Sequence, residues 1–281
     1  MPQITQLKTP NSFNITQILE CGQCFRFTRL DDDRYKIIAR QRTLSIKQSG
    51  DKVTFSCSPS EFESIWHDYF DLSRDYVKIK STISERDPIM AAAIEHAPGI
   101  RILKQDFWEM VISFIISQNN RIPMIKKVIE NICARYGDEI EGGFAFPSAD
   151  QMAKASIEEL MELKTGFRAK YIADAVLKRC EGHLDEDELS ALDSSELNTR
   201  LTAIKGIGDK VAHCIMMMGL GRMDVFPTDV WIKRIISELY FEGKDTPLKD
   251  IQAFAGDRWG DNAGIAQQYL FHYARLKKIG K

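Results

Sequence analysis

The stretch "LTAIKGIGDKVAHCIMMMGLGRMDVFPTD", which runs from Leu201 to Asp229, determines the predicted fold. Gly206 and Gly208 frame a single isoleucine between two segments of helical periodicity. Glycine adopts backbone angles that strain other residues, and the helix after Gly208 offers free N–H donors and a partial positive charge. A Gly-x-Gly alone is more often an ordinary turn between packed helices. With its neighbours, the pattern predicts a helix-hairpin-helix at about residues 195–220 that binds phosphate without reading base sequence.

The second helix of this hairpin carries a lysine in its first turn, within an otherwise apolar segment. Lys210 and Cys214 lie one turn apart and share a face of the helix. The positive end of a helix and partial burial both disfavour an ammonium ion, so the neutral amine, which is a nucleophile, becomes more available. The alternative is a solvated lysine on the outer face of the helix.

An aspartate closes the same stretch. Asp229 follows Phe226-Pro227 and precedes "VWIKRI", which places it at or near the N-cap of the next helix. Capping is the ordinary role of such a residue and, taken alone, the more frequent one. A carboxylate held there has a second use, because it can balance positive charge on a sugar ring or deprotonate an attacking amine.

Composition and net charge limit the class of protein that this chain can be. The 281 residues are 44% hydrophobic and 28% charged with a net charge of −2, which indicates a globular chain without overall basicity. This excludes only a strongly cationic protein, since nucleic-acid binding depends on local patches. The first twelve residues lack an apolar signal core, and no run approaches a membrane span. We expect an intracellular monomer with no membrane partner, cytoplasmic and nucleoid-associated if the source is prokaryotic.

The cysteine pattern does not predict a metal site. Cys21-Gly-Gln-Cys24 resembles half a zinc site or a redox pair, but no second close pair exists and no histidine stands at ligand spacing. Reduced, mostly buried thiols are the simpler interpretation and fit a reducing compartment.

The chain changes character near residue 85. Short alternating segments precede it and predict an antiparallel meander, with strands at Cys24–Arg29, Arg34–Ala39, Thr43–Lys47 and Lys52–Ser56. From Asp87 onward nearly every segment has helical periodicity. The predicted fold class is therefore α+β, with a small antiparallel sheet domain and flanking helices at residues 1–85, packed on a helical body at residues 86–281.

Five separated motifs, in order, resemble one family. "GIGDKVAHC…VFPTDVWI" resembles the signature of the helix-hairpin-helix DNA glycosylases that carry a Gly/Pro-rich loop and an aspartate. "GQCFRF", "GIRILKQDFWEMVISFIISQNN", "TGFRAKYI" and "GIAQQYLF" resemble segments of the 8-oxoguanine DNA glycosylase branch. The resemblance covers most of the chain, from Gly22 to Phe271, and implies a partner: double-stranded DNA that contains 8-oxoguanine.

The resemblance also implies residue roles. Lys210 resembles the nucleophile that attacks the sugar, expels the base and forms a Schiff base, after which elimination nicks the strand 3′ to the lesion. Asp229 resembles the acid that assists it. The target base must leave the stack to reach Lys210. No cofactor is required, although a cation bound by the hairpin backbone is left open.

The implied base pocket draws on both parts of the chain. Cys214 and Phe271 resemble the two faces that sandwich the flipped base, Gln267 the amide that binds its Watson–Crick edge, and Pro227 part of the lining. Gly22 resembles the residue whose backbone carbonyl accepts the N7 hydrogen of 8-oxoguanine and repels the N7 lone pair of guanine.

On the opposite strand, Phe167 resembles the wedge and Asn119 the residue that fills the vacated space. Arg168 resembles one of two arginines that bind the orphaned cytosine in eukaryotic members. The other position is occupied by Met124, which has no N–H donor, so we expect a relaxed preference for the opposite base. Arg121 lies nearby, but on a helix it would point about 90° away.

A further departure and two alternatives remain. Trp231 stands where the branch often has a phosphate-binding histidine, and its indole N–H can donate one hydrogen bond at this position. An alkylbase glycosylase of the same superfamily would act without Lys210. A non-catalytic hairpin that only grips DNA would not need Gln267, Phe271 and the Lys210–Asp229 pair together.

Overall fold

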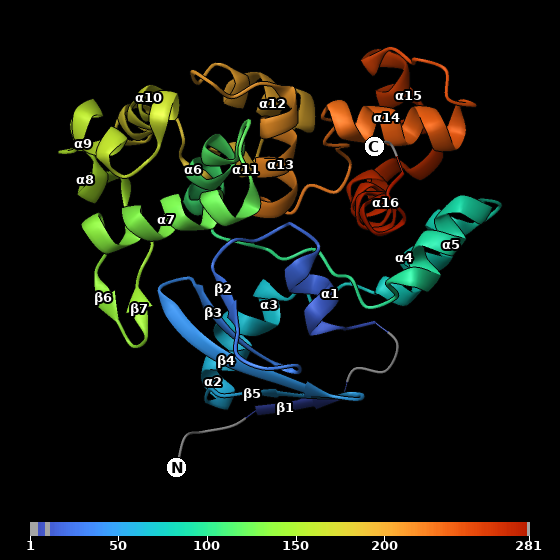
Figure 1. Cartoon of the computed structure of the whole chain (residues 1–281), viewed down its shortest axis with the longest axis horizontal. Helices are drawn as coiled ribbons and strands as arrows, with labels where there is room; N and C mark the ends of the chain where they lie inside the picture. The colour runs from blue at the N-terminus through green and yellow to red at the C-terminus, as the bar shows by residue number, and fades with distance from the viewer. Residues whose placement is uncertain (1–4, 9–11, 280–281) are drawn as a thin grey trace.

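The computed structural model describes residues 5–8 and 12–279 and confirms the α+β class. An antiparallel five-stranded sheet, with strand order β1-β5-β4-β3-β2, lies below a layer of helices (Figure 1). Its strands are β1 (Thr5–Lys8), β2 (Phe27–Arg29), β3 (Arg34–Ala39), β4 (Arg42–Ser49) and β5 (Lys52–Phe55). Alternate residues of β3 and β4 point into the core, as expected for a sheet with one solvated face.

The first predicted strand is shorter than expected. Residues 24–26 lie outside any strand, and β2 begins only at Phe27. The reason is that Cys24 and Phe25 are both buried, which breaks the alternation that a strand requires. Arg26 turns toward the helical body, where it contacts Glu109 and the carbonyl of Phe144.

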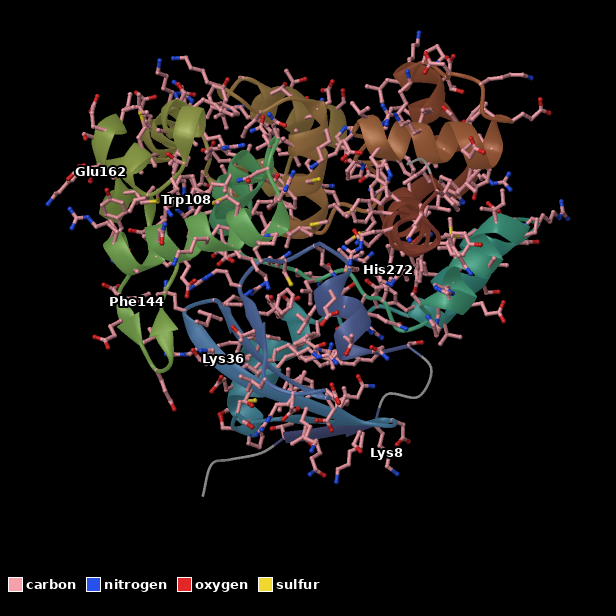
Figure 2. The ribbon with its side chains drawn as sticks, in the orientation of Figure 1. Lys8, Lys36, Trp108, Phe144, Glu162 and His272 are labelled. Atoms are coloured by element: carbon pink, nitrogen blue, oxygen red, sulfur yellow. The ribbon has the colours of Figure 1, made fainter. Side chains whose placement is uncertain are left out.

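The segment after the sheet is helical but irregular. It forms α2 (Pro59–Glu61), a π-helical turn at Phe62–Trp66 and α3 (His67–Tyr69). Phe62 and Trp66, four residues apart, share a face of this segment, and both enter the core of the sheet domain. Strand β1 and the hairpin of β6 (Glu139–Ile140) with β7 (Gly143–Phe144) were not anticipated from the sequence. Lys36 of β3 donates to the Gly142 carbonyl, so this hairpin contacts the sheet, as the labelled Lys36 and Phe144 show in Figure 2.

The helical body contains most of the predicted helices. The Asp87-Pro88 start and the capping box at Ser148 are confirmed. The helices outside the α2–α3 segment are α1 (Ile15–Glu20), α4 (Tyr76–Ser84), α5 (Pro88–His96), α6 (Phe107–Ser117), α7 (Ile122–Tyr136), α8 (Ala149–Met152), α9 (Ile157–Glu162), α10 (Ala169–Cys180), α11 (Glu186–Ser190), α12 (Ser194–Thr202), α13 (Asp209–Gly219), α14 (Val230–Tyr240), α15 (Leu248–Trp259) and α16 (Ala263–Lys277), with 3-10 turns at Gly166–Arg168 and Gly260–Asn262.

Two hydrophobic clusters organise the packing. One surrounds the inner face of the sheet and includes Tyr35, Phe55 and Trp66. The larger one runs through α6, α13 and α16, and it also takes in Cys21 and Phe25 from the loop before β2. This loop is therefore the place where the sheet domain enters the helical body. Within the part of the chain that the structure describes, no helix is long and apolar enough to cross a membrane.

Candidate active site

The predicted hairpin joins α12 to α13, and its geometry requires glycine at Gly206. The backbone there has a φ of +81°, and a Cβ atom would lie 2.4 Å from the ring of Tyr171. The N–H of Lys205 donates to the Asp174 carboxylate of α10 at 2.9 Å, and this hydrogen bond fixes the hairpin to α10. Gly208 is exposed, and α13 begins after it without a side-chain cap. The first N–H groups of α13 are therefore available to a phosphate.

Lys210 lies half-buried in the first turn of α13. Its Nζ is 5.5 Å from the centroid of the Phe114 ring in α6, within the range of a cation–π contact. Cys214, one turn later, is buried, and burial raises the pKa of its thiol. The charge of Lys210 opposes that shift and the charge of Asp229 adds to it, so both side chains lie within electrostatic reach of this thiol.

Asp229 is the N-cap of α14. Its Oδ1 accepts a hydrogen bond from the N–H of Ile232 at 2.8 Å, so the capping role is confirmed. Oδ2 accepts no hydrogen bond from residues 5–8 or 12–279, and Asp229 forms no ion pair with Lys210 there. The segment before it is fixed by Gln252, whose amide donates to the Phe226 carbonyl and to Thr228. One carboxylate oxygen thus remains available at a rigid position.

An open cavity of about 880 Å³ brings Lys210 and Asp229 together. Four segments contribute its walls: the end of α6 with the turn after it, the hairpin with the start of α13, the start of α14, and the first residue of α15. The lining residues are Ser117, Gln118, Asn119, Asn120, Gly208, Asp209, Lys210, Val211, Thr228, Asp229, Val230, Trp231, Lys233 and Leu248.

The proposed base-pocket residues lie beside this cavity and do not line it. Cys214, Pro227 and Gln267 are buried, and Phe271 is half-buried. Trp231 lines the cavity and packs edge-to-face on Phe271 at a centroid distance of 4.9 Å. In the described part of the chain, the Gln267 amide has no hydrogen-bond partner although only 6% of the residue is exposed. Its donor and acceptor groups are therefore free to bind a ligand.

Gly22 lies against the same helix. Its φ of +96° favours glycine, and a Cβ atom there would lie 3.3 Å from Cε1 of Phe271. The structure therefore brings the loop before β2 to α16, as the resemblance implied for a shared pocket. The neighbouring thiols of Cys21 and Cys24 are free and buried, and burial raises the pKa of Cys21 to about 11.

The residues expected on the opposite strand include Asn119, which also lines this cavity. Asn119, Met124 and Phe167 are all exposed, and Asn119 has a left-handed φ of +48°. Arg168 is different, because it is only 7% exposed and its guanidinium faces inward. It donates four hydrogen bonds, to the carbonyls of Thr165, Gln118 (twice) and Asn119. Its donors therefore support the Asn119 turn in this arrangement. Burial also lowers the pKa of Arg168.

Sequence comparison agrees with this geometry. A family model described as the 8-oxoguanine DNA glycosylase N-terminal domain matches residues 6–111, and one described as a HhH-GPD superfamily base excision DNA repair protein matches residues 112–259. The structure of MBOgg1 in complex with a low-affinity DNA ligand has a TM-score of 0.94 at 42% identity, covering 99% of this chain and 97% of that one. The chain belongs to the 8-oxoguanine DNA glycosylase family.

Two further relatives support the same assignment. The Clostridium acetobutylicum 8-oxoguanine glycosylase/lyase, in complex with DNA that has cytosine opposite 8-oxoG, has a TM-score of 0.91 at 37% identity, over 99% of this chain and 100% of that one. An Arabidopsis thaliana N-glycosylase/DNA lyase is 29% identical over 95% of this chain and 77% of its own length.

In this family member, sequence reasoning missed several site residues. Phe114, which faces Lys210, sits in a mostly apolar, buried helix and carries no distinguishing signal. Gln252 and Tyr171 support the aspartate loop and the hairpin through tertiary contacts that no local pattern encodes. Arg121 also differs from the expectation, because it is the extended N-cap of α7 and not part of the helix. Among the described residues, no group of three His, Cys, Asp or Glu side chains is placed to hold a metal.

Proposed function

We propose that this protein is a bifunctional glycosylase that excises 8-oxoguanine from duplex DNA and nicks the strand through a Schiff base on Lys210. The observation that carries the proposal is the open cavity shared by Lys210 and the free Oδ2 of Asp229. The hairpin N–H groups of Gly206 and Gly208 bind the DNA backbone. Exposed Phe167 fills the stack of the opposite strand once the lesion has flipped.

The chemistry is nucleophilic substitution followed by elimination. The Nζ lone pair of Lys210 attacks C1′, and the glycosidic electron pair leaves with the base, which takes up a proton. Asp229 balances the positive charge that develops on the sugar and accepts a proton from the amine. The sugar ring then opens to a Schiff base, loss of a C2′ proton breaks the C3′–O bond, and the strand is nicked 3′ to the lesion. The aromatic wall of Phe114 beside Lys210 limits solvation of the amine.

Recognition of the lesion rests on two polar groups at the pocket. The unpaired Gln267 amide binds the Watson–Crick edge of the flipped base, which stacks between Cys214 and Phe271 beside Pro227. The Gly22 carbonyl accepts the N7 hydrogen that 8-oxoguanine carries and guanine lacks. An unmade buried hydrogen bond costs about 1–3 kcal/mol, which is enough to set the preference.

The same proposal includes the cofactor requirement, the oligomeric state, the cellular location and the preference for the opposite base. The reaction needs no cofactor, and a cation held by the hairpin carbonyls would assist phosphate binding only. The protein acts as a monomer on DNA inside the cell, in the nucleoid if the source is prokaryotic. Cytosine opposite the lesion is preferred weakly, because Met124 offers no donor and Arg168 is already engaged.

Borohydride trapping on duplex DNA with 8-oxoguanine tests the function. Wild-type protein should form a covalent adduct, while Lys210→Gln should lose both adduct and excision and keep lesion binding. Trapping that persists in this variant would identify another amine as the nucleophile. An alkylbase glycosylase would excise without an adduct, and a non-catalytic hairpin module would bind without excision.

A further inference from the structure

The loop before β2 is fastened to α16 by side chains that bind its backbone carbonyls. The carbonyl of Glu20 accepts a hydrogen bond from Nη2 of Arg275 at 2.7 Å, and that of Cys21 accepts one from Nε2 of Gln268 at 3.0 Å. Gln268 is 3% exposed and Cys21 is fully buried, so the second bond lies away from water. A hydrogen bond in such a low-dielectric place is stronger and costly to lose.

The other end of the loop is fastened to the helical body. The carbonyl of Gln23 accepts a hydrogen bond from Nε2 of Gln105 at 2.8 Å. The side chain of Gln23 is fully buried, donates to the Ile18 and Arg101 carbonyls, and accepts from the N–H of Leu103 at 2.8 Å. This side of the loop therefore has little freedom to move.

Between these anchors, the Gly22 carbonyl is left without a protein donor. Of the four consecutive carbonyls from Glu20 to Gln23, it is the one that accepts no hydrogen bond within the part of the chain described. Its orientation thus depends on the peptide planes before and after it. Because glycine rotates more freely than any other residue, loss of either anchor frees this carbonyl to turn.

The anchor on the Cys21 side comes from the helix that carries the pocket residues. Gln268, Phe271 and Arg275 are spaced three and four residues apart and share one face of α16, next to α1 in Figure 1. Phe271 contacts Gly22, and Gln267 precedes Gln268 directly. One rigid helix therefore fixes the distance between the base-stacking ring, the base-binding amide and the Gly22 carbonyl.

We infer that Gln268 is a positioning residue that sets the discrimination between 8-oxoguanine and guanine. The inference rests on the proposed function, in which the Gly22 carbonyl accepts the N7 hydrogen of the lesion. Gln268 touches neither base nor sugar, and it acts by fixing the peptide that precedes Gly22. Without its amide donor, the carbonyl loses its fixed direction and no longer distinguishes an N7 hydrogen from an N7 lone pair.

The test compares two reactions of the same protein. Gln268→Met keeps the side-chain length and removes the donor. Single-turnover excision of 8-oxoguanine should fall about ten- to a hundredfold, and the binding preference for 8-oxoguanine over guanine duplexes about tenfold, the scale of one buried hydrogen bond. Nicking at a preformed abasic site needs Lys210 and no base, so it should stay within about twofold of wild type, since a base contact contributes nothing to that step.

Tyr269→Phe is the matched control. It removes a hydrogen bond from the next residue of α16 to the Ile100 carbonyl, which is not in the pocket loop. It should leave the ratio of excision to abasic nicking unchanged. Gln268→Glu, which keeps the length but offers a carboxylate in place of the donor, serves as a second variant if the methionine variant folds poorly.

The outcomes separate the inference from the function. Wild-type protein that neither prefers nor excises 8-oxoguanine would overturn the proposed function and the inference with it. If the wild-type protein excises 8-oxoguanine and both Gln268 variants keep its preference for the lesion, the inference alone is overturned. Excision and abasic nicking could instead fall equally and in step with the melting temperature, or both variants could fail to fold. Either result would show that Gln268 serves fold stability and would also overturn the inference.

Discussion

The two sides of the proposed active site are built in contrasting ways. On the lesion side, Gln267 is buried and the backbone around Gly22 is fastened by buried side-chain amides. On the opposite-strand side, Phe167 is 54% exposed and Met124 is 44% exposed. Arg168, the guanidinium nearest to Phe167, is turned inward to backbone carbonyls.

This contrast indicates which side of the site discriminates between bases. A buried polar group in a fixed position discriminates strongly, because the wrong ligand leaves it unpaired. Exposed apolar side chains stack on any base, since every base has an aromatic face. The protein is therefore expected to select the damaged base closely and to tolerate different partners of that base.

After the loss expected for Lys210→Gln, the largest effect is expected at Asp229, which serves the reaction whichever base lies opposite. Asp229→Asn keeps an oxygen for the N–H of Ile232 but loses the charge. Excision should fall about a hundredfold or more, the usual range for a group that manages protons in the transition state. Single-turnover rates and thermal unfolding measured on the same preparations decide between catalysis and capping.

Asp193→Asn provides the control for that measurement. Asp193 caps α12 in the same way, through a hydrogen bond from the N–H of Glu196 at 2.8 Å. Both variants should lower the melting temperature slightly, and only Asp229→Asn should lose excision. A loss of activity in proportion to stability in both would show that Asp229 acts only as a cap.

The second effect should appear on the opposite-strand side. Met124→Arg introduces a donor at an exposed position in the first turn of α7. If this side lacks only a polar contact, the preference for cytosine opposite 8-oxoguanine should sharpen by about one to two powers of ten, the value of a good contact to a base edge. Wild-type protein should excise the lesion measurably opposite all four bases.

Ile122→Arg separates a base contact from simple charge. Ile122 is 41% exposed in the same turn, so either arginine adds similar attraction to phosphate. Only Met124→Arg should change the ratio of rates on the four duplexes. A wild-type cytosine preference above about a thousandfold, well beyond the 1–3 kcal/mol of one contact, would remove the basis of the comparison.

The same contrast explains what the sequence could and could not predict. The α+β class, the hairpin and the positions of Lys210 and Asp229 follow from local signals: glycine spacing, helical periodicity and a capping aspartate. The strand expected at Cys24–Arg29 was partly wrong, because Cys24 and Phe25 are both buried and tertiary hydrogen bonds hold the loop before them to the helical body. No periodic pattern records such contacts, since Gln268 and Cys21 lie 247 residues apart.

Arg168 shows the limit on the other side. Its place in "TGFRAKYI" is visible in the sequence, but the direction of a guanidinium is set by its tertiary partners. Here those partners are the carbonyls of the Asn119 turn, some fifty residues earlier. The sequence identifies the residue, and the structure adds that its donors bind backbone carbonyls.

The smallest effect on the reaction itself is expected at Glu109, whose titration changes the stability of the protein on the lesion side. Glu109 of α6 pairs with Arg26 of the loop segment at 3.5 Å, and burial raises its pKa to about 7 although Arg26 opposes the shift. An acid with a raised pKa in the folded state stabilises the fold fully below its unfolded value of 4.5 and loses that contribution as pH rises through about 7. The free energy of unfolding should therefore fall by a few kcal/mol between pH 4.5 and 8, because each unit of difference between the folded and unfolded pKa is worth about 1.4 kcal/mol.

Glu109→Gln should flatten this dependence of stability on pH. The control is Glu162→Gln, at an exposed position in α9, which should leave the dependence unchanged. Urea unfolding at several pH values measures the slope. A slope unchanged in Glu109→Gln would mean that another group, and not this buried carboxyl, causes the pH dependence of stability.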